Sequence, residues 1–237
     1  MSLLQVRGLE AYYGDFQALF GIDFEVYEGE IVAVIGANGA GKSTFLRSIA
    51  GQIAGRSESV IFGGQAMGDW PSHQVVREGI SMVPEGRRLF PSLSVEENLK
   101  MGTFAKRSGP WTLSRVYQLF PVLQEKAKVP STTLSGGQQQ MVAIGRALMS
   151  NPKLLLCDEI SLGLAPSVIK DIYTAVPAIC AEGTAVVLVE QDIDMALQAS
   201  RRYYCFMHGR VSLTGESSLG EKSEISAAYF GTEASAA

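Results

Sequence analysis

The sequence predicts an α/β protein with a mostly parallel sheet, an N-terminal antiparallel β subdomain and an inserted helical subdomain. Three observations lead to this prediction. Apolar and polar residues alternate through residues 1–30, which is typical of half-buried antiparallel strands. The stretch Ile31–Ile35 is continuously apolar and rich in β-branched residues, as in strands covered on both faces of a parallel sheet. Residues 96–133 instead show helical periodicity and no buried-strand run.

Strands and helices alternate in the predicted sheet. The expected elements are, in order, a strand over residues 31–35, a helix over 43–50, a strand over 154–157, a helix over 167–181 and a strand over 185–189. Alternation of this kind implies right-handed crossovers and parallel strands. Helical periodicity around residues 95–101 and 116–123 is interrupted at Gly109-Pro110 and Phe120-Pro121, so several short helices are expected there.

Composition limits the classes of function. The chain has 237 residues, of which 46% are hydrophobic, and this is enough for one substantial core. The formal net charge of −4 argues against a general nucleic-acid binder, and no nucleic-acid partner is expected. The chain begins without a cationic-then-apolar stretch, and its apolar runs are too short to cross a bilayer. At a membrane it would therefore act as a peripheral partner.

The cysteine, histidine and paired arginine residues are not expected to take part in catalysis or metal binding. Cys157, Cys180 and Cys205 stand in apolar surroundings and are expected to be buried small hydrophobes. His73 and His208 have no partners at metal-ligand spacing, and His208 is expected in a hairpin turn. The pairs at residues 87–88 and 201–202 are expected to be solvated.

A glycine-rich turn follows the strand over residues 31–35. Gly36–Ser43 has the sequence Gly-Ala-Asn-Gly-Ala-Gly-Lys-Ser, which fits the phosphate-binding loop pattern. Its backbone N–H groups would converge on an anion at the positive end of the following helix. Lys42 would contact the β- and γ-phosphates of ATP, and Ser43 would bind Mg²⁺. The predicted nucleotide-binding residues here are Gly36, Asn38, Gly39, Ala40, Gly41, Lys42, Ser43 and Thr44.

Two acidic residues, Asp158 and Glu159, follow the strand over residues 154–157. The carboxyl ends of parallel strands meet at one edge of a sheet, where the phosphate loop also lies. Asp158 would hold Mg²⁺, through water, and Glu159 would polarise the attacking water as general base. Acidic strand ends are common and alone are a weak signal, but combined with the phosphate loop they strongly indicate a site for nucleotide phosphates and Mg²⁺.

The pentapeptide Leu134–Gln138, Leu-Ser-Gly-Gly-Gln, precedes a helix expected over residues 139–149. A Ser-Gly-Gly turn at a helix start is a second anion-binding device, and one phosphate loop cannot use both. We therefore expect Ser135 and Gly137, flanked by Gly136 and Gln138, to contact the γ-phosphate of ATP bound to another subunit. The alternative, a helix merely capped by Ser135, leaves the double glycine unexplained.

These three motifs, in this order and spacing, resemble the ATPase domain of the ATP-binding-cassette (ABC) superfamily over residues 4–231. Within it, segments 12–14, 83–91 and 161–166 resemble the ATPase subunits of branched-chain amino-acid importers. The resemblance implies that Tyr13 stacks on adenine. Spacing alone leaves open a half-buried tyrosine at the end of a strand.

Three positions depart from the pattern of the superfamily in a way that resembles the subfamily, and a fourth departs from both. Glu85 stands where the superfamily has glutamine, Gln191 where it has a switch histidine, and Ala165 where it has aspartate. Ile160 departs even from the subfamily, which has proline there. Gln191 cannot titrate near neutral pH, but its amide can donate to a phosphate oxygen. It therefore joins Lys42 and Glu159 in the catalytic set as a positioning group.

Glu85 could join Ser43 and Asp158 as a metal ligand, or it could serve only as a hinge. The resemblance also implies one ABC ATPase domain over residues 1–237. Residues 1–85 and 150–230 would form its nucleotide-binding core, residues 86–149 its helical subdomain and residues 231–237 a tail.

By this resemblance, ATP hydrolysis with Mg²⁺ energises uptake of branched-chain amino acids or related small polar solutes. The expected partners are a second ABC ATPase subunit, two membrane permease subunits and, indirectly, a solute-binding protein. A heterodimer of ATPase subunits is favoured and a homodimer is open, at the cytoplasmic face of the inner or plasma membrane. A soluble ABC ATPase in a non-transport process is the alternative, although no paired cassette or coiled-coil insertion is visible. The pentapeptide argues against a phosphate-loop kinase or GTPase.

Overall fold

The computed structural model describes residues 2–218 and 225–226, so the tail expected over residues 231–237 lies outside the described residues. The N-terminal part is a four-stranded antiparallel sheet with strand order β2-β1-β4-β5. Its strands are β1 (Ser2–Tyr13), β2 (Phe16–Tyr27), β4 (Val60–Phe62) and β5 (Gln65–Ala66). The alternation in residues 1–30 predicted β1 and β2, whereas β4 and β5 were not predicted.

The central sheet has six strands in the order β10-β9-β3-β8-β7-β6. Its strands are β3 (Ile31–Ile35), β6 (Ile80–Val83), β7 (Leu154–Asp158), β8 (Ala185–Glu190), β9 (Arg202–Met207) and β10 (Arg210–Glu216). All neighbours are parallel except β9 and β10. The predicted mostly parallel sheet is confirmed, with β6, β9 and β10 added to the three strands that the sequence indicated.

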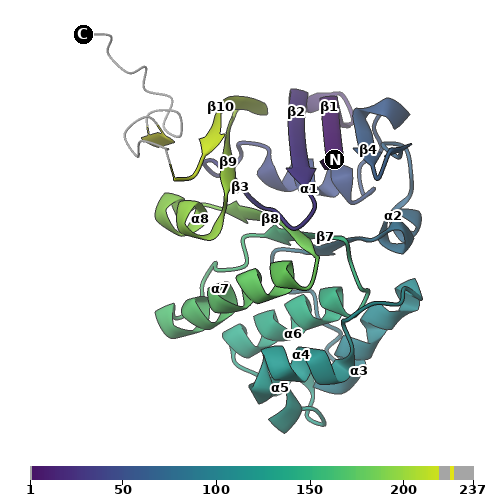
Figure 1. Ribbon diagram of the computed structural model, residues 1–237, viewed down its shortest axis with the longest axis vertical. Coiled ribbons are helices and arrows are strands. Elements are labelled where there is room, and N and C mark those ends of the chain that lie inside the picture. Colours follow the sequence, from purple (N-terminus) through teal and green to yellow (C-terminus); the bar gives the residue numbers. More distant parts are fainter. Residues whose placement is uncertain (1, 219–224, 227–237) are drawn as a thin grey trace.

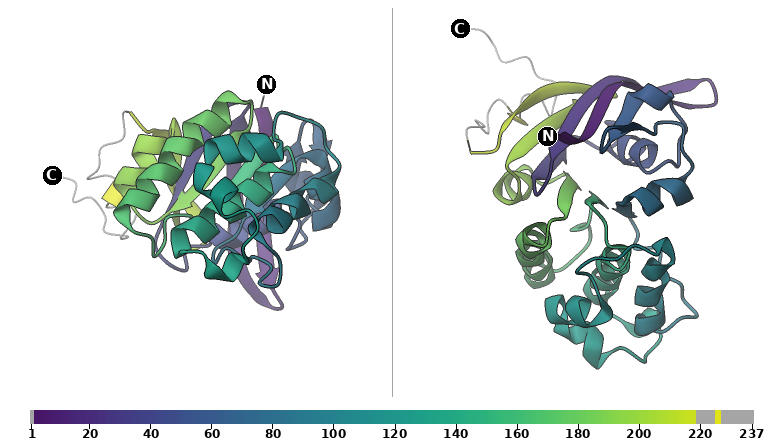
Figure 2. Two further views of the ribbon diagram at one scale, coloured as in Figure 1. Left: turned by 90° about the horizontal axis from the view of Figure 1, so that it is seen from below. Right: turned by 45° about the vertical axis from the view of Figure 1, so that its right-hand side comes forward.

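The helices occupy two regions. Four accompany the strands of the central sheet along the chain: α1 (Lys42–Ile49), α2 (Ser72–Glu78), α7 (Pro166–Ala181) and α8 (Ile193–Ala199). The helices α3 (Val95–Met101), α4 (Leu113–Leu119), α5 (Pro121–Glu125) and α6 (Gly136–Leu148) gather at the end of the molecule opposite β1 and β2 (Figures 1 and 2). Short 3₁₀ turns lie at Ser57–Ser59, Gly102–Ala105 and Ser131–Thr133. Helix α4 ends before Pro121, as the sequence indicated, because proline has no N–H to donate.

The central sheet separates two large hydrophobic cores, and a smaller third cluster contains residues of β3, β9 and α8. Along β7, Leu154 and Leu156 face the core that also contains α1 and the antiparallel sheet. Leu155 and Cys157 face the other core, which contains residues of α3 to α7. Because side chains alternate across a strand, one short apolar run serves both cores. The carboxyl ends of β3, β7 and β8 are thereby fixed side by side, and this edge of the sheet carries the site described below.

Two expectations of the sequence are wrong. Arg202 is not solvated: its Nε donates to Glu30 Oε1 at 2.7 Å and its Nη2 to Glu30 Oε2 at 2.9 Å. The pairing of β9 with β3 brings Arg202 beside the turn that carries Glu30. Cys180 is half-buried rather than buried, and its thiol donates to the Gly29 carbonyl oxygen.

None of the helices within the described residues is long and apolar enough to cross a membrane.

Candidate nucleotide-binding site

The phosphate loop joins the end of β3 to the start of α1. Gly39 and Gly41 have φ values of 80° and 101°, which glycine adopts without steric cost. A Cβ at Gly36 would lie 2.4 Å from the Phe206 carbonyl oxygen, so only glycine fits there. No side chain caps α1. The N–H groups of its first turn can therefore bind an anion.

The loop forms one wall of a pocket of about 660 Å³. The predicted residues that line it are Tyr13, Asn38, Gly39, Ala40, Gly41, Lys42, Ser43, Thr44, Glu85, Glu159 and Gln191. They come from five separate stretches of the chain. Tyr13 is 46% exposed, and its hydroxyl lies 3.4 Å from Thr44 Oγ1, so its ring is available at the pocket wall.

Of the three residues predicted to be catalytic, Lys42 and Gln191 each contact Glu159. The Lys42 ammonium is buried and donates to the carbonyl oxygens of Gly36 at 2.6 Å and Ala37 at 3.1 Å. Its Nζ also lies 3.4 Å from Glu159 Oε1. Gln191 Nε2 donates to Glu159 Oε2 at 2.6 Å. The Glu159 carboxylate is therefore held from two sides.

Glu159 has an unusual backbone conformation. Its φ is 50°, a left-handed value that costs a non-glycine residue roughly 1–2 kcal/mol. Such strain persists where the surrounding structure holds the residue in place, and it is concentrated at functional sites. Here the Glu159 N–H donates to the Val189 carbonyl oxygen at 3.0 Å. Val189 of β8 therefore holds the backbone of Glu159, and Gln191, the residue after β8, holds its side chain.

Asp158 and Ser43 form a place that fits a divalent cation. Ser43 Oγ donates to Asp158 Oδ1 at 2.9 Å, whereas the buried Asp158 Oδ2 has no hydrogen-bond partner among the described residues. Burial raises the pKa of the Asp158 carboxyl, and the hydrogen bond from Ser43 opposes this shift. A hard cation with oxygen ligands would satisfy the free oxygen. Glu85 is exposed and lines the pocket at the phosphate loop, and it lines a further hollow together with Asp158.

The turn at residues 135–138 does not line the pocket at the phosphate loop. Ser135 Oγ accepts from the Gln138 N–H at 3.3 Å, and the Ser135 N–H donates to Gln138 Oε1 at 3.1 Å. This capping box starts α6 three residues before the expected start at residue 139. Among the described residues that line the pocket, none of Ser135, Gly136, Gly137 and Gln138 occurs. The structure therefore does not bring this turn to the phosphate loop of its own chain.

The double glycine also has a packing role that the sequence interpretation did not include. A Cβ at Gly137 would lie 2.2 Å from Val168 Cγ1, and a Cβ at Gly136 would lie 3.0 Å from Arg87 Nη2. Glycine at these positions allows α6 to approach α7 and the Arg87 loop closely.

Sequence reasoning missed seven residues that line the pocket: Phe16, Gln17, Ala18, Phe20, Leu162, His208 and Gly209. Phe16 is 70% exposed and pairs with Tyr13 across the β1–β2 turn, so the predicted hairpin could have suggested it. His208 is exposed in the β9–β10 turn, as expected, but this turn contacts the phosphate loop because the Gly209 N–H donates to the Ala40 carbonyl oxygen at 3.0 Å. No sequence signal pointed to that contact.

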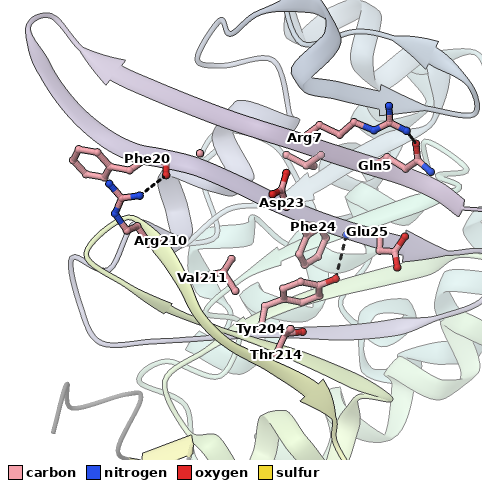
Figure 3. Close-up of a pocket in the computed structure, with 12 residues that line it drawn as sticks. Gln5, Arg7, Phe20, Asp23, Phe24, Glu25, Tyr204, Arg210, Val211 and Thr214 are labelled. Atoms are coloured by element: carbon pink, nitrogen blue, oxygen red, sulfur yellow. Dashed lines mark hydrogen bonds between the residues drawn. The ribbon is translucent and has the colours of Figure 1, made fainter. Parts of the chain in front are cut away.

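A second hollow, of about 650 Å³, lies between β2 and the β9–β10 hairpin (Figure 3). Its polar side chains already have partners within the protein. Arg210 donates to the Phe20 carbonyl oxygen at 3.1 Å and stacks over the Phe20 ring. Tyr204 accepts from the Glu25 N–H at 3.3 Å. We therefore assign the functional site to the pocket at the phosphate loop.

The fold and this pocket define a phosphate-loop nucleoside triphosphatase. Residues 19–161 match the family described as ABC transporter. The high-affinity branched-chain amino acid transport ATP-binding protein BraG of Pseudomonas aeruginosa is 44% identical over 97% of this chain and 100% of its own length. A probable branched-chain amino acid transport ATP-binding protein, LivF of Archaeoglobus fulgidus, is 32% identical over 90% of this chain and 92% of its own.

A solved structure supports the same assignment. A crystal structure of a nucleotide-free ATP-binding cassette from an ABC transporter matches with a TM-score of 0.78 and 28% identity, covering 98% of this chain and 96% of that chain. This chain belongs to the ABC transporter family, and it is an ATP-binding ATPase of that family.

Proposed function

We propose that this chain is the ATP-hydrolysing subunit of an importer for branched-chain amino acids or related small polar solutes. The contacts of Lys42 and Gln191 with Glu159 beside the phosphate loop support the hydrolytic role. The solute class is supported by the 44% identity to BraG over the whole length of that protein. A soluble ABC ATPase acting in a non-transport process is the alternative.

In this proposal ATP binds with its adenine against Tyr13 and its phosphates over residues 36–44. Lys42 leaves the carbonyl oxygens of Gly36 and Ala37 and contacts the β- and γ-phosphates. Glu159 accepts a proton from the water whose oxygen attacks the γ-phosphorus, and the bond to the ADP oxygen breaks. Gln191 keeps the Glu159 carboxylate in place during this step.

We also propose that Ser43 and Asp158 hold Mg²⁺, with Glu85 as a further candidate ligand. When bound, Mg²⁺ neutralises charge on the β- and γ-phosphate oxygens. The unpartnered Asp158 Oδ2 supports this assignment.

The remaining proposals concern partners and organisation. Residues 135–138 act on ATP bound to a facing ABC ATPase subunit, and a heterodimer is favoured over a homodimer. Two permease subunits bind the pair of ATPase subunits, which is peripheral at the cytoplasmic face of the membrane. A solute-binding protein acts indirectly through the permease subunits.

The chain itself is organised as one ABC ATPase domain. Residues 1–85 and 150–230 form the nucleotide-binding core, and residues 86–149 form the helical subdomain. No nucleic acid takes part.

Solute-stimulated ATPase activity tests the transport proposal. We expect the chain, copurified with its permease and solute-binding partners and reconstituted in vesicles, to hydrolyse ATP faster when leucine is added with the binding protein. Urea and a dicarboxylate serve as competing solute classes. Stimulation by one of these and not by leucine would reassign the solute. Failure to copurify with any permease would favour the soluble alternative.

Dilution tests the requirement for a facing subunit. We expect the ATPase rate per chain to fall as the isolated chain is diluted, because Ser135 and Gly137 reach ATP only in a pair of subunits. The measurement is phosphate release against chain concentration at saturating ATP. Ser135→Arg, which places a bulky cation at the proposed contact, should lower the plateau rate, whereas Ser114→Arg on the exposed face of α4 should not. A rate per chain that is independent of concentration would contradict the paired arrangement.

A further inference from the structure

Glu190 is a buried carboxylate next to the proposed catalytic residues. It is the last residue of β8 and is 2% exposed. Its Oε2 accepts from Ser161 Oγ at 2.7 Å, and its Oε1 accepts from the Tyr173 hydroxyl at 2.5 Å. Ser161 lies two residues after Glu159, and Tyr173 lies on α7. One side chain thus joins the end of β8, the loop after Glu159 and a helix.

The stability of the fold does not by itself explain a buried carboxylate at residue 190. None of the salt bridges within residues 2–218 and 225–226 includes Glu190. Burying a charge without a cationic partner costs free energy, and hydrogen bonds such as those from Ser161 and Tyr173 offset this cost. Burial raises the pKa of Glu190, and the hydrogen bonds from Tyr173 and Ser161 oppose that shift.

The hydrogen bonds of Glu190 continue those that hold Glu159. The Glu159 N–H donates to the Val189 carbonyl oxygen at 3.0 Å, and Gln191 Nε2 donates to Glu159 Oε2 at 2.6 Å. Successive residues 189, 190 and 191 of one segment therefore bind residues 159 and 161 of the other. The strained residue lies between these bonds, with a φ of 50°. Releasing Ser161 would free the backbone immediately after it.

We propose that Glu190 is a positioning residue for hydrolysis: by holding Ser161, it keeps the strained Glu159 backbone in the orientation that places the Glu159 carboxylate against Gln191. Tyr173 fixes the second oxygen of Glu190 and so sets the direction from which Ser161 is held. The inference rests on the proposed role of Glu159 as general base.

Steady-state kinetics of four variants tests the inference. Ser161→Ala and Tyr173→Phe each remove one hydroxyl donor, Glu190→Ala removes the acceptor, and Glu190→Gln keeps its size and one acceptor oxygen. We expect about a tenfold lower kcat for the first three, because small misplacements of a catalytic group are costly. KM for ATP should stay within about twofold, since the phosphate loop is unchanged. Glu190→Gln should recover much of the loss.

A comparison of kcat between single and double variants is the sharper test. If Ser161 acts through Glu190, the double variant Ser161→Ala/Glu190→Ala should be no slower than Glu190→Ala alone. Tyr117→Phe is the matched control, because the Tyr117 hydroxyl has no hydrogen-bond partner among the described residues. Its kcat should equal that of the parent. All rates are taken at a chain concentration where the parent rate no longer depends on concentration, and each is divided by the measured number of ATP-binding sites.

The outcomes separate the inference from the proposed function. A kcat within twofold of the parent for Glu190→Ala and Tyr173→Phe, even with a lower Tm, would show that Glu190 is only structural. Additive losses in the double variant would also overturn the inference. A parental rate for Glu159→Gln would instead remove the role of Glu159 as general base.

Discussion

Glu159→Gln is expected to lower kcat for ATP hydrolysis by at least about 10²-fold while leaving ATP binding intact. A general base contributes roughly 10²–10⁴-fold to the rate of a reaction of this kind. The substituted amide keeps an oxygen that can accept the hydrogen bond from Gln191, which Glu159 Oε2 accepts at 2.6 Å in this structure. It cannot accept a proton from water at neutral pH. The loss should therefore appear in kcat.

Phosphate release gives kcat, and calorimetric titration of the same preparation with ATP gives the affinity for ATP. Glu28→Gln is a matched control, because Glu28 is exposed and lies outside the pocket at the phosphate loop. The variant should also accumulate as an ATP-bound pair of subunits, visible as a larger species in gel filtration with ATP. A rate within tenfold of the parent would place the base on another residue.

Lys42→Ala is expected to weaken ATP binding by about 10–100-fold. The ammonium is 4% exposed, and hydrogen bonds to charged groups contribute about 1.5–3 kcal/mol each. Its removal also leaves the Glu159 carboxylate, now 3.4 Å from Nζ, without a cation and facing the γ-phosphate. The repulsion adds to the lost attraction, so the Kd for ATP should rise even though the loop backbone is unchanged.

Calorimetric titration with ATP and Mg²⁺ gives this Kd. Lys42→Arg should fail to restore binding, because the planar guanidinium is larger than an ammonium and requires a different geometry. Lys170→Ala, at an exposed position of α7, is the control for loss of one positive charge. An unchanged Kd for Lys42→Ala would show that the backbone N–H groups alone hold the phosphates.

Much of the fold could be predicted because its signals are local. The apolar run at residues 31–35 is β3, the run at 154–157 is within β7, and the run at 185–189 is within β8. The amphipathic segment at 167–181 is α7, apart from one residue at its start. In each case the spacing of apolar residues within the segment indicates whether one or both of its faces are buried.

Elements without such a signal were missed. Strand β9 begins with Arg202 and contains Tyr203 and Tyr204, so its sequence lacks the purely aliphatic run of its neighbours. Its place beside β3 depends on the whole sheet, and with it come the Arg202–Glu30 pair and the contact of Gly209 with Ala40. Phe16 and His208 at the pocket have the same origin, because two separate turns bring them to the phosphate loop.

The sequence by itself determined the class of this protein, because the phosphate loop, the acidic pair at 158–159 and the turn at 135–138 are short patterns with intrinsic chemistry. Only the tertiary structure decided which of these residues meet. Ser43 and Asp158 are 115 residues apart in the chain, and Glu159 and Gln191 are 32 apart. Their contacts follow from the order of parallel strands in the central sheet. That order also leaves Ser135 away from the phosphate loop of its own chain and places the buried Glu190 beside Ser161, because packing of distant segments sets both positions.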